Sequence, residues 1–296
     1  MFDVIGLGYS TVDYIGVVPH MPESDSKLLL DEFTRQGGGP AATATVAAAR
    51  LGAKTAFVGR VGGDDFGEFM ISELSREGVD VSHVHRCEGA ESQFSFIMVE
   101  RETGKRTILW TRSSIPPLDP SQLDRGFMSS CKVLHLDRHE IRAGIQAAQW
   151  VHESGAIVSL DAGTFVPEIT ELMPLVNVLI ASYIFAKEAT AQEDPAEAAR
   201  ALLSDRKIAG VTCGDKGSWF ATSGGGRFHV PAFEVDVVDT NGAGDVFHGA
   251  FAFGLAKGWN AERCARFASA TAALKCTKLG GRAGIPDLAE VEKLLR

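Results

Sequence analysis

The chain lacks a long apolar segment, a basic leader and an excess of positive charge. No stretch of its 296 residues approaches the roughly 20 consecutive apolar residues that a membrane-spanning helix needs. The N-terminal residues carry neither the basic region nor the apolar run of a secretory signal. Lys and Arg number 29 against 38 Asp and Glu, which gives a net charge of −9. A chain this acidic suits neither nucleic acid nor an anionic membrane surface, so we expect a cytoplasmic protein without such partners.

Cysteine is scarce and is not spaced for a metal or redox motif. The five cysteines form no C-x-x-C pair and lie at positions 87, 131, 213, 264 and 276. Reduced thiols in a cytoplasm fit this pattern best. Hydrophobic residues make up 45% of the chain, so it can bury a sizeable core.

Short apolar runs alternate with segments of helical character along most of the chain. Buried strands are predicted near 2–7, 54–58, 132–136, 156–160, 176–181 and 207–212. Helices are predicted near 41–51, 139–153, 195–204, 243–256, 261–275 and 288–295. This order predicts an α/β fold with a mostly parallel sheet and crossover helices. Two segments, about 14–35 and 88–112, instead read as short strands with turns, and we expect them to form a small β-sheet lid within one domain, 1–296.

The sequence D-T-N-G-A-G-D at 239–245 precedes an apolar helix and carries the strongest chemical signal. Gly242 and Gly244 give the backbone freedom at a helix N-terminus, whose free N–H groups form an anion site. Asp245 lies in the first helical turn, where the helix dipole is expected to keep its carboxylate ionised as a proton acceptor. A base beside an anion cradle suits phosphoryl transfer to a hydroxyl, although a plain helix cap is the alternative.

Two glycine-containing segments near the N-terminus allow more than one interpretation. Gly6 and Gly8 suggest a dinucleotide-binding turn, but the third glycine of that motif is replaced by Thr11. Asp13 is either a polar group that faces a ligand or a turn-stabilising residue. The glycines at 37–39 precede a Pro-started, alanine-rich helix, and they allow its N-terminus to approach a ligand closely.

Further polar residues follow the later predicted strands. His135, Arg138 and His139 cluster after one strand, which allows a zinc site, a satisfied core histidine, a ligand-binding arginine or a surface ion pair. The stretch 211–218 follows another strand and ends in glycines, so it is either a nucleotide contact or a plain tight turn.

Three stretches together resemble the ribokinase family of sugar kinases, also called the phosphofructokinase-B family. They are the glycine and helix region at 37–67, the D-T-N-G-A-G-D motif at 239–245 and the loop G-R-A-G-I-P at 281–286. The resemblance covers essentially the whole chain. It implies a ribokinase-like fold, with helices on both faces of the sheet, and an ATP-dependent carbohydrate kinase.

The resemblance also implies roles for individual residues. Asp245 would deprotonate the sugar hydroxyl, and the backbone N–H groups of Gly242, Ala243 and Gly244 would hold the charge that develops on the γ-phosphoryl group. Asp13, Gly38 and Gly39 would contact the sugar. The residues that would face the nucleotide are Thr212, Gly214, Gly217 and Thr240. Mg²⁺ would bridge the phosphates of ATP, a monovalent cation such as K⁺ often binds beside the anion hole in this family, and many members dimerise through their lids.

Some family positions are changed. The usual asparagine after the first glycines is Ala42, and the N-x-x-E segment corresponds to 182–185, S-Y-I-F, as in ketohexokinase-like members. The chain is also similar to bacterial sulfofructose kinases, in which a lysine, an asparagine and an arginine are thought to grip a sulfonate. Lys27 and Arg138 match two of these positions, and Trp110 replaces the asparagine.

The substrate expected from this resemblance is a ketose. Phosphorylation at the one-position hydroxyl of 6-deoxy-6-sulfofructose is one possibility, and a neutral ketose such as fructose is another, because tryptophan suits an apolar sugar face better than a sulfonate. The lost N-x-x-E groups keep open a different class of function, a non-catalytic sensor of a sugar or nucleotide.

Overall fold

The computed structural model describes all 296 residues, which form a large mixed sheet, covering helices and a separate small sheet. The strands of the large sheet are β1 (Phe2–Leu7), β4 (Thr55–Gly62), β5 (Val84–Cys87), β8 (Cys131–Leu136), β9 (Ile157–Ala162), β10 (Val178–Ser182), β11 (Ile208–Thr212), β12 (Ser218–Thr222) and β13 (Arg227–Val230). They lie in the order β13-β12-β11-β10-β9-β8-β1-β4-β5. The strands from β11 to β5 pair in parallel, and only β12 and β13 pair antiparallel.

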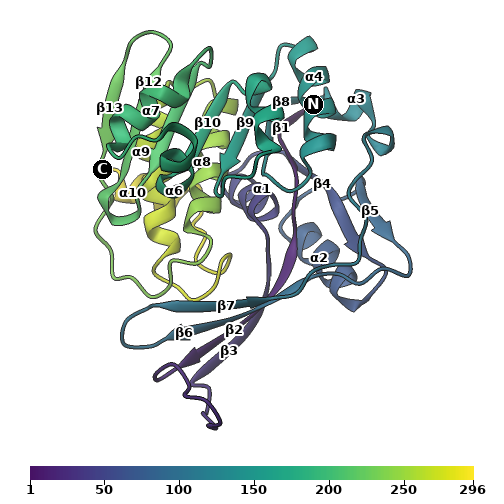
Figure 1. Cartoon of the computed structure of the whole chain (residues 1–296), viewed down its shortest axis with the longest axis vertical. Coiled ribbons are helices and arrows are strands. Elements are labelled where there is room, and N and C mark those ends of the chain that lie inside the picture. Colours follow the sequence, from purple (N-terminus) through teal and green to yellow (C-terminus); the bar gives the residue numbers. More distant parts are fainter.

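Helices cover both faces of the large sheet (Figure 1). They are α1 (Pro40–Arg50), α2 (Asp65–Arg76), α3 (Arg125–Met128), α4 (Ile141–Glu153), α5 (Ile169–Leu172), α6 (Tyr183–Thr190), α7 (Pro195–Leu203), α8 (Ala243–Ala256), α9 (Ala261–Lys275) and α10 (Leu288–Leu294), with short 3-10 turns at Pro120–Gln122, Met173–Leu175 and Gly214–Lys216. Side chains alternate between two apolar clusters along a strand: Val4 belongs to the cluster that includes residues of α8 and α9, whereas Ile5 belongs to the cluster that includes residues of α4 and α7. The α/β fold that the sequence predicts is therefore confirmed.

Helices α1 and α8 pack closely at the middle of the molecule. A Cβ atom on Gly249 of α8 would lie 2.1 Å from the carbonyl oxygen of Ala44 on α1, so glycine is required at this contact. The alanines of α1 are buried against α8. Because small side chains let the two helices approach, their N-termini lie near each other at the carboxyl ends of the parallel strands, where α/β sheets bind ligands.

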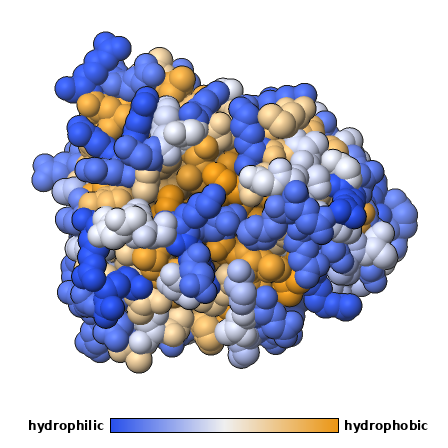
Figure 2. Space-filling view, turned by 90° about the horizontal axis from the view of Figure 1, so that it is seen from above, coloured by the Kyte–Doolittle hydropathy of each residue, from blue (hydrophilic) through white to orange (hydrophobic).

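The small sheet forms the predicted lid. Its strands are β2 (Thr11–Val18), β3 (Glu32–Gly38), β6 (Phe94–Glu100) and β7 (Arg106–Trp110), in the order β3-β2-β6-β7. Figure 1 shows this sheet as a separate layer below the carboxyl ends of the main strands. Figure 2 shows the opposite face, where hydrophilic side chains surround apolar ones gathered in the middle.

Several local expectations need correction. After Gly8 the chain enters the lid strand β2 and not a helix, so the dinucleotide-binding interpretation is wrong. The short strand β5, which is not among the predicted strands, joins the edge of the main sheet beside β4. Helix α6 was not expected from the sequence; the Ser182 hydroxyl caps it by accepting the Phe185 N–H at 3.1 Å. No helix of the structure is long and apolar enough to cross a membrane.

Candidate active site

The turn before α8 is held by hydrogen bonds to one buried residue, Asp239. Asp239 is fully buried, and its two carboxylate oxygens accept the N–H groups of Asn241 and Gly280, each at 2.8 Å. Gly242 caps the helix with a φ of 73°, which favours glycine. A Cβ atom on Gly244 would meet no atom within 4 Å, so open space lies beside the first helical turn. The free N–H groups there can bind an anion.

This turn separates two cavities. The smaller cavity, of about 170 Å³, is lined by Asp13, Gly38 and Gly39 and by Gly242 and Asp245. The remaining lining residues are Tyr9, Thr11, Pro40, Thr43, Ser95, Ile97, Ile108, His139, Asn241 and Gly281. The larger cavity, of about 600 Å³, has Ala243 and Gly244 in its wall. A group bound in one cavity and a group bound in the other would therefore meet at the N-terminus of α8.

The environment of Asp245 differs from the sequence-based expectation. Burial, together with the nearby carboxylate of Asp161, raises the pKa of Asp245 to about 7. The expected stabilisation of the carboxylate by the helix dipole is outweighed, because Asp13 and Asp137 add further negative charge. A pKa close to neutral suits a general base, which must both accept and release a proton near pH 7.

Asp13 and the two glycines opposite it form one compact group. Asp13 lies on β2 and is buried, and burial raises its pKa to about 6 against the opposing effects of Arg282 and Ser95. A Cβ atom on Gly38 would lie 2.2 Å from the Asp13 carboxylate, so glycine allows the backbone to approach it. Gly39 caps α1 with a φ of 91°. The structure thus brings all three predicted sugar contacts to the smaller cavity.

The four residues expected to face a nucleotide lie together in the larger cavity. Its lining includes Thr212, at the end of β11, together with Gly214, Gly217 and Thr240. Apolar side chains complete the wall, among them Phe233, Val235 and Phe247. An apolar cleft with a polar end at a helix N-terminus fits a flat ring joined to an anionic group.

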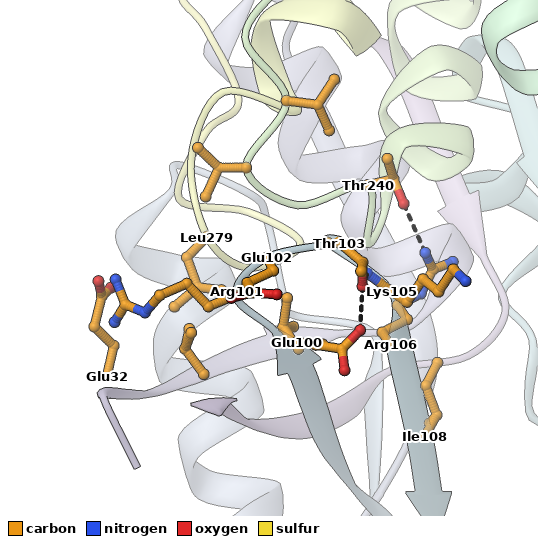
Figure 3. Close-up of a pocket in the computed structure, with 15 residues that line it drawn as sticks. Glu32, Glu100, Arg101, Glu102, Thr103, Lys105, Arg106, Ile108, Thr240 and Leu279 are labelled. Carbon is orange, nitrogen blue, oxygen red and sulfur yellow. Dashed lines mark hydrogen bonds between the residues drawn. The ribbon is translucent and has the colours of Figure 1, made fainter. Parts of the chain in front are cut away.

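A lid residue that the sequence reasoning missed also reaches the turn. Arg106 at the start of β7 donates a hydrogen bond from Nη1 to the Thr240 hydroxyl at 2.7 Å, as Figure 3 shows. The two residues border a cavity of about 930 Å³ between the lid turn at 101–106 and the loop at 237–240. Arg106 therefore brings a positive charge from the lid to the edge of the larger cavity. Arginine at the start of a predicted strand offers no sequence signal for this contact.

Three predicted substrate contacts lie outside the smaller cavity. Lys27 is exposed in the loop between β2 and β3, and Arg138 is partly exposed just after β8; neither lines the cavity. Trp110 is 64% exposed at the end of β7, where it pairs with Ser95 of β6. Because directly paired residues point to the same side of a sheet, Trp110 shares a face with Ser95, a cavity residue. The roles of all three remain predictions.

Comparison with known proteins identifies the family. The model of the pfkB family of carbohydrate kinases matches residues 1–288. This chain is a member of the pfkB carbohydrate kinase family. Among its relatives, the ribokinase of Haemophilus influenzae is 28% identical, with 98% of this chain and 97% of the relative covered. Probable fructokinase-3 of Arabidopsis thaliana is also 28% identical, with 99% and 91% covered.

The solved structures of ribokinases have the same fold as this kinase. Arabidopsis thaliana ribokinase complexed with ribose and ATP superposes with a TM-score of 0.86 at 25% identity, covering 100% of this chain and 99% of that chain. Thermotoga maritima ribokinase superposes with a TM-score of 0.84 at 26% identity, with the same coverage. The ribokinase-like architecture with its separate small sheet is therefore confirmed.

The histidines near the site form no zinc centre in this kinase. No three His, Cys, Asp or Glu side chains come together as a metal-holding group, so the zinc interpretation is wrong. His135 is buried, yet neither ring nitrogen has a hydrogen-bond partner, so it is not a satisfied core histidine either. Burial lowers its pKa to about 3. His139 instead lines the smaller cavity and stacks on Tyr9 with a ring distance of 4.2 Å.

The buried pair His248 and Asp161 lies behind Asp245. His248 is one helical turn after Asp245, and its Nε2 is 3.2 Å from Oδ1 of Asp161 on β9. The segment that replaces N-x-x-E has a structural role, because Ser182 caps α6 and Phe185 is fully buried. The acidic groups near the turn, among them Asp13, Asp137, Asp161 and Asp245, therefore come from other elements and not from this segment.

Proposed function

We propose that this kinase transfers the γ-phosphoryl group of ATP to a hydroxyl of a ketose. The observation that carries the proposal is the position of the α8 turn in the wall of both cavities, with Asp245 on the side of Asp13 and Gly244 on the side of Thr212. A hydroxyl held by Asp13 in the smaller cavity would face the γ-phosphate of a nucleotide in the larger one. Phosphoryl transfer needs this in-line meeting of acceptor and donor.

Each group of the turn would have one task. Asp245, with a pKa of about 7, would accept the proton of the attacking hydroxyl. The free N–H groups of Gly242, Ala243 and Gly244 would hold the charge on the γ-phosphoryl oxygens, as donors aimed at developing charge do. Mg²⁺ would neutralise phosphate charge; the carboxyl groups near the turn suit it, because Mg²⁺ is commonly held by one or two carboxylates and substrate phosphates.

The lining of the smaller cavity favours a neutral sugar over an anionic one. It contains the carboxyl groups of Asp13 and Asp245 and no Lys or Arg side chain. A neutral ketose such as fructose avoids repulsion by these carboxyl groups. The second candidate is 6-deoxy-6-sulfofructose. Lys27 and Arg138 favour this substrate, but both lie outside the cavity and would have to reach the sulfonate from there. Trp110 does not favour a sulfonate.

We also infer that the kinase forms a homodimer through its lid. The edge strand β7 is exposed along its whole length and carries three large apolar side chains, those of Ile108, Leu109 and Trp110. An exposed apolar edge strand is a template for pairing with another chain. A measured mass of one chain in solution at micromolar concentration, by light scattering, would contradict this part of the proposal.

A panel of acceptors tests the proposed reaction. ADP formation is followed with ATP and Mg²⁺ and with fructose, sulfofructose, fructose phosphates, ribose or a nucleoside, and ³¹P NMR identifies the phosphorylated hydroxyl. We expect turnover with a ketose, phosphorylation of one hydroxyl, and loss of activity when EDTA removes Mg²⁺. Binding of sugar and ATP without turnover for any acceptor would point to the non-catalytic sensor instead.

A further inference from the structure

Lys275 is the only lysine among the buried residues, and it lies directly behind the phosphate-binding turn. It is the last residue of α9, and none of its surface is exposed. Its Nζ donates a hydrogen bond to the backbone oxygen of Asp239 at 2.7 Å. A buried ammonium group costs free energy unless charges and hydrogen bonds compensate it, so such a group in a folded protein calls for an explanation.

The surroundings of Lys275 show what compensates its charge. The carboxylates of Asp239 and Asp245 act to keep the side chain protonated, although burial lowers the pKa of Lys275. Arg106, which donates a hydrogen bond to Thr240, acts in the opposite direction and helps to lower the pKa of Lys275. The loop after α9 packs tightly on Lys275, because a Cβ atom on Gly284 would lie 2.2 Å from its carbonyl oxygen. The ammonium group is therefore held on the backbone of Asp239, and the charges of Asp239 and Asp245 favour its protonated form.

The family resemblance implies a monovalent cation beside the anion site. The oxygen atoms of Asp239 are not free to bind such an ion, because each already accepts a hydrogen bond. The backbone oxygen of Asp239 accepts from Lys275, and its two carboxylate oxygens accept from the N–H groups of Asn241 and Gly280. All three oxygens of this residue thus have a hydrogen-bond donor. The donor set does not fit a second cation at this place.

We propose that Lys275 is a built-in cation of the phosphoryl-transfer site, so that the kinase does not depend on K⁺ or another monovalent ion. The ammonium group fixes Asp239, and through it the turn Thr240–Gly242, while its charge acts on the anion site from behind. Lys275 is a positioning residue, since it does not touch the substrates. The inference rests on the proposed kinase function.

The wild-type protein tests the proposal first. ADP formation and the melting temperature are measured at constant ionic strength in tetramethylammonium chloride, NaCl and KCl. We expect the three rates to agree within about twofold and the melting temperature to be insensitive to the ion, because the charge is already present. Activation of about tenfold or more by K⁺, or stabilisation that saturates with K⁺, would overturn the proposal.

Replacement of the lysine gives the second test. Lys275→Met keeps much of the shape and removes the charge, and Lys278→Met, an exposed lysine three residues later, is the matched control. In tetramethylammonium chloride we expect kcat of Lys275→Met to fall about tenfold or more, since preorganised charge behind an anion site is lost. Methylammonium, ammonium or K⁺ should restore part of the rate and raise the melting temperature of this variant alone.

The outcomes separate three explanations. Lys275→Met could lose stability without any recovery of its rate or melting temperature when an ion is added. That result would show that Lys275 has only a structural role, and it would contradict the proposal. If this variant does not fold, the wild-type ion comparison still decides. If no acceptor is phosphorylated in the presence of any of these ions, the proposed kinase function is wrong. The melting temperatures of wild type and Lys275→Met, measured with and without K⁺, then still test whether Lys275 takes the place of a monovalent ion.

Discussion

The turn before α8 and the lid strand β7 border the same site but are built in opposite ways. The turn is partly exposed, but it is fixed by hydrogen bonds from Asn241, Gly280 and Lys275 to a single buried residue, Asp239. Strand β7 is exposed at every position and is joined to the body of the molecule by one side-chain hydrogen bond, from Arg106 to Thr240. The contrast indicates that the groups proposed for the chemistry are preorganised, whereas the proposed substrate contact Trp110 lies on an exposed strand, where side chains can vary.

The largest effect is expected where the turn itself is altered. Gly242→Val places a β-branched side chain at a φ of 73° and 3.0 Å from backbone atoms of Gly281. We expect kcat to fall about 100-fold or more, because misplaced anion-hole donors cost that much. Steady-state ADP formation measures it.

Gly225→Val is the matched control for this change. Gly225 has a φ of 82° in the turn between β12 and β13, with open space around it and far from the cavities. The control should lose stability by about 1–2 kcal/mol through the left-handed conformation and keep its kcat. Equal losses of kcat in both variants would mean that the effect does not come from the anion site at the turn before α8.

The ionisation of Asp245 should appear in the pH dependence. Since only the carboxylate can accept a proton, kcat/KM should fall about tenfold per pH unit below pH 7. Because the pKa of Asp245 in the folded protein lies above its usual value of 3.8, stability falls as the pH rises from about 4 to about 7 and does not change further above that range.

Asp245→Asn should therefore stabilise the protein at pH 8, where the wild-type side chain is charged, and have a much smaller effect near pH 4. Urea unfolding at the two pH values measures this difference. A variant that is destabilised at pH 8 would contradict the raised pKa.

The lid contact should have a smaller effect. Arg106→Ala removes the charge that reaches Thr240, and we expect kcat/KM for ATP to fall about tenfold, as for loss of a hydrogen bond to a charged group. Arg101→Ala removes an arginine of the same lid turn, which pairs with Asp31, and should change kcat/KM little. Similar losses in both variants would assign the effect to lid charge in general.

The smallest effect is expected at the end of β7. Trp110→Ala should raise KM for the sugar about threefold with kcat unchanged, since an aromatic face contributes modestly to binding. Leu109→Ala is the control, because Leu109 pairs with Phe96 and points to the other side of the lid. A large loss of kcat in Trp110→Ala would mean that the lid takes part in the chemistry.

The same contrast explains what the sequence could predict. The glycines and aspartates of the turn are recognisable because only those residue types fit left-handed φ values and helix N-termini, so Gly242 and Asp245 stand out locally. The long parallel strands were also predictable from their apolar runs. Contacts such as Arg106 with Thr240 and Lys275 with Asp239 join residues 134 and 36 positions apart and leave no local pattern. The raised pKa of Asp245 likewise depends on Asp161 from a distant strand.

The central claim is that the turn before α8 is the phosphoryl-transfer centre. Its most direct test is the turnover rate of Asp245→Asn, measured with the best acceptor, ATP and Mg²⁺ at pH 8. The variant should fold and still bind ATP, as followed by its melting temperature. Its kcat should lie about 100-fold or more below that of wild type, because the base is lost while the anion site remains. A folded variant that turns over within about twofold of wild type would contradict the account.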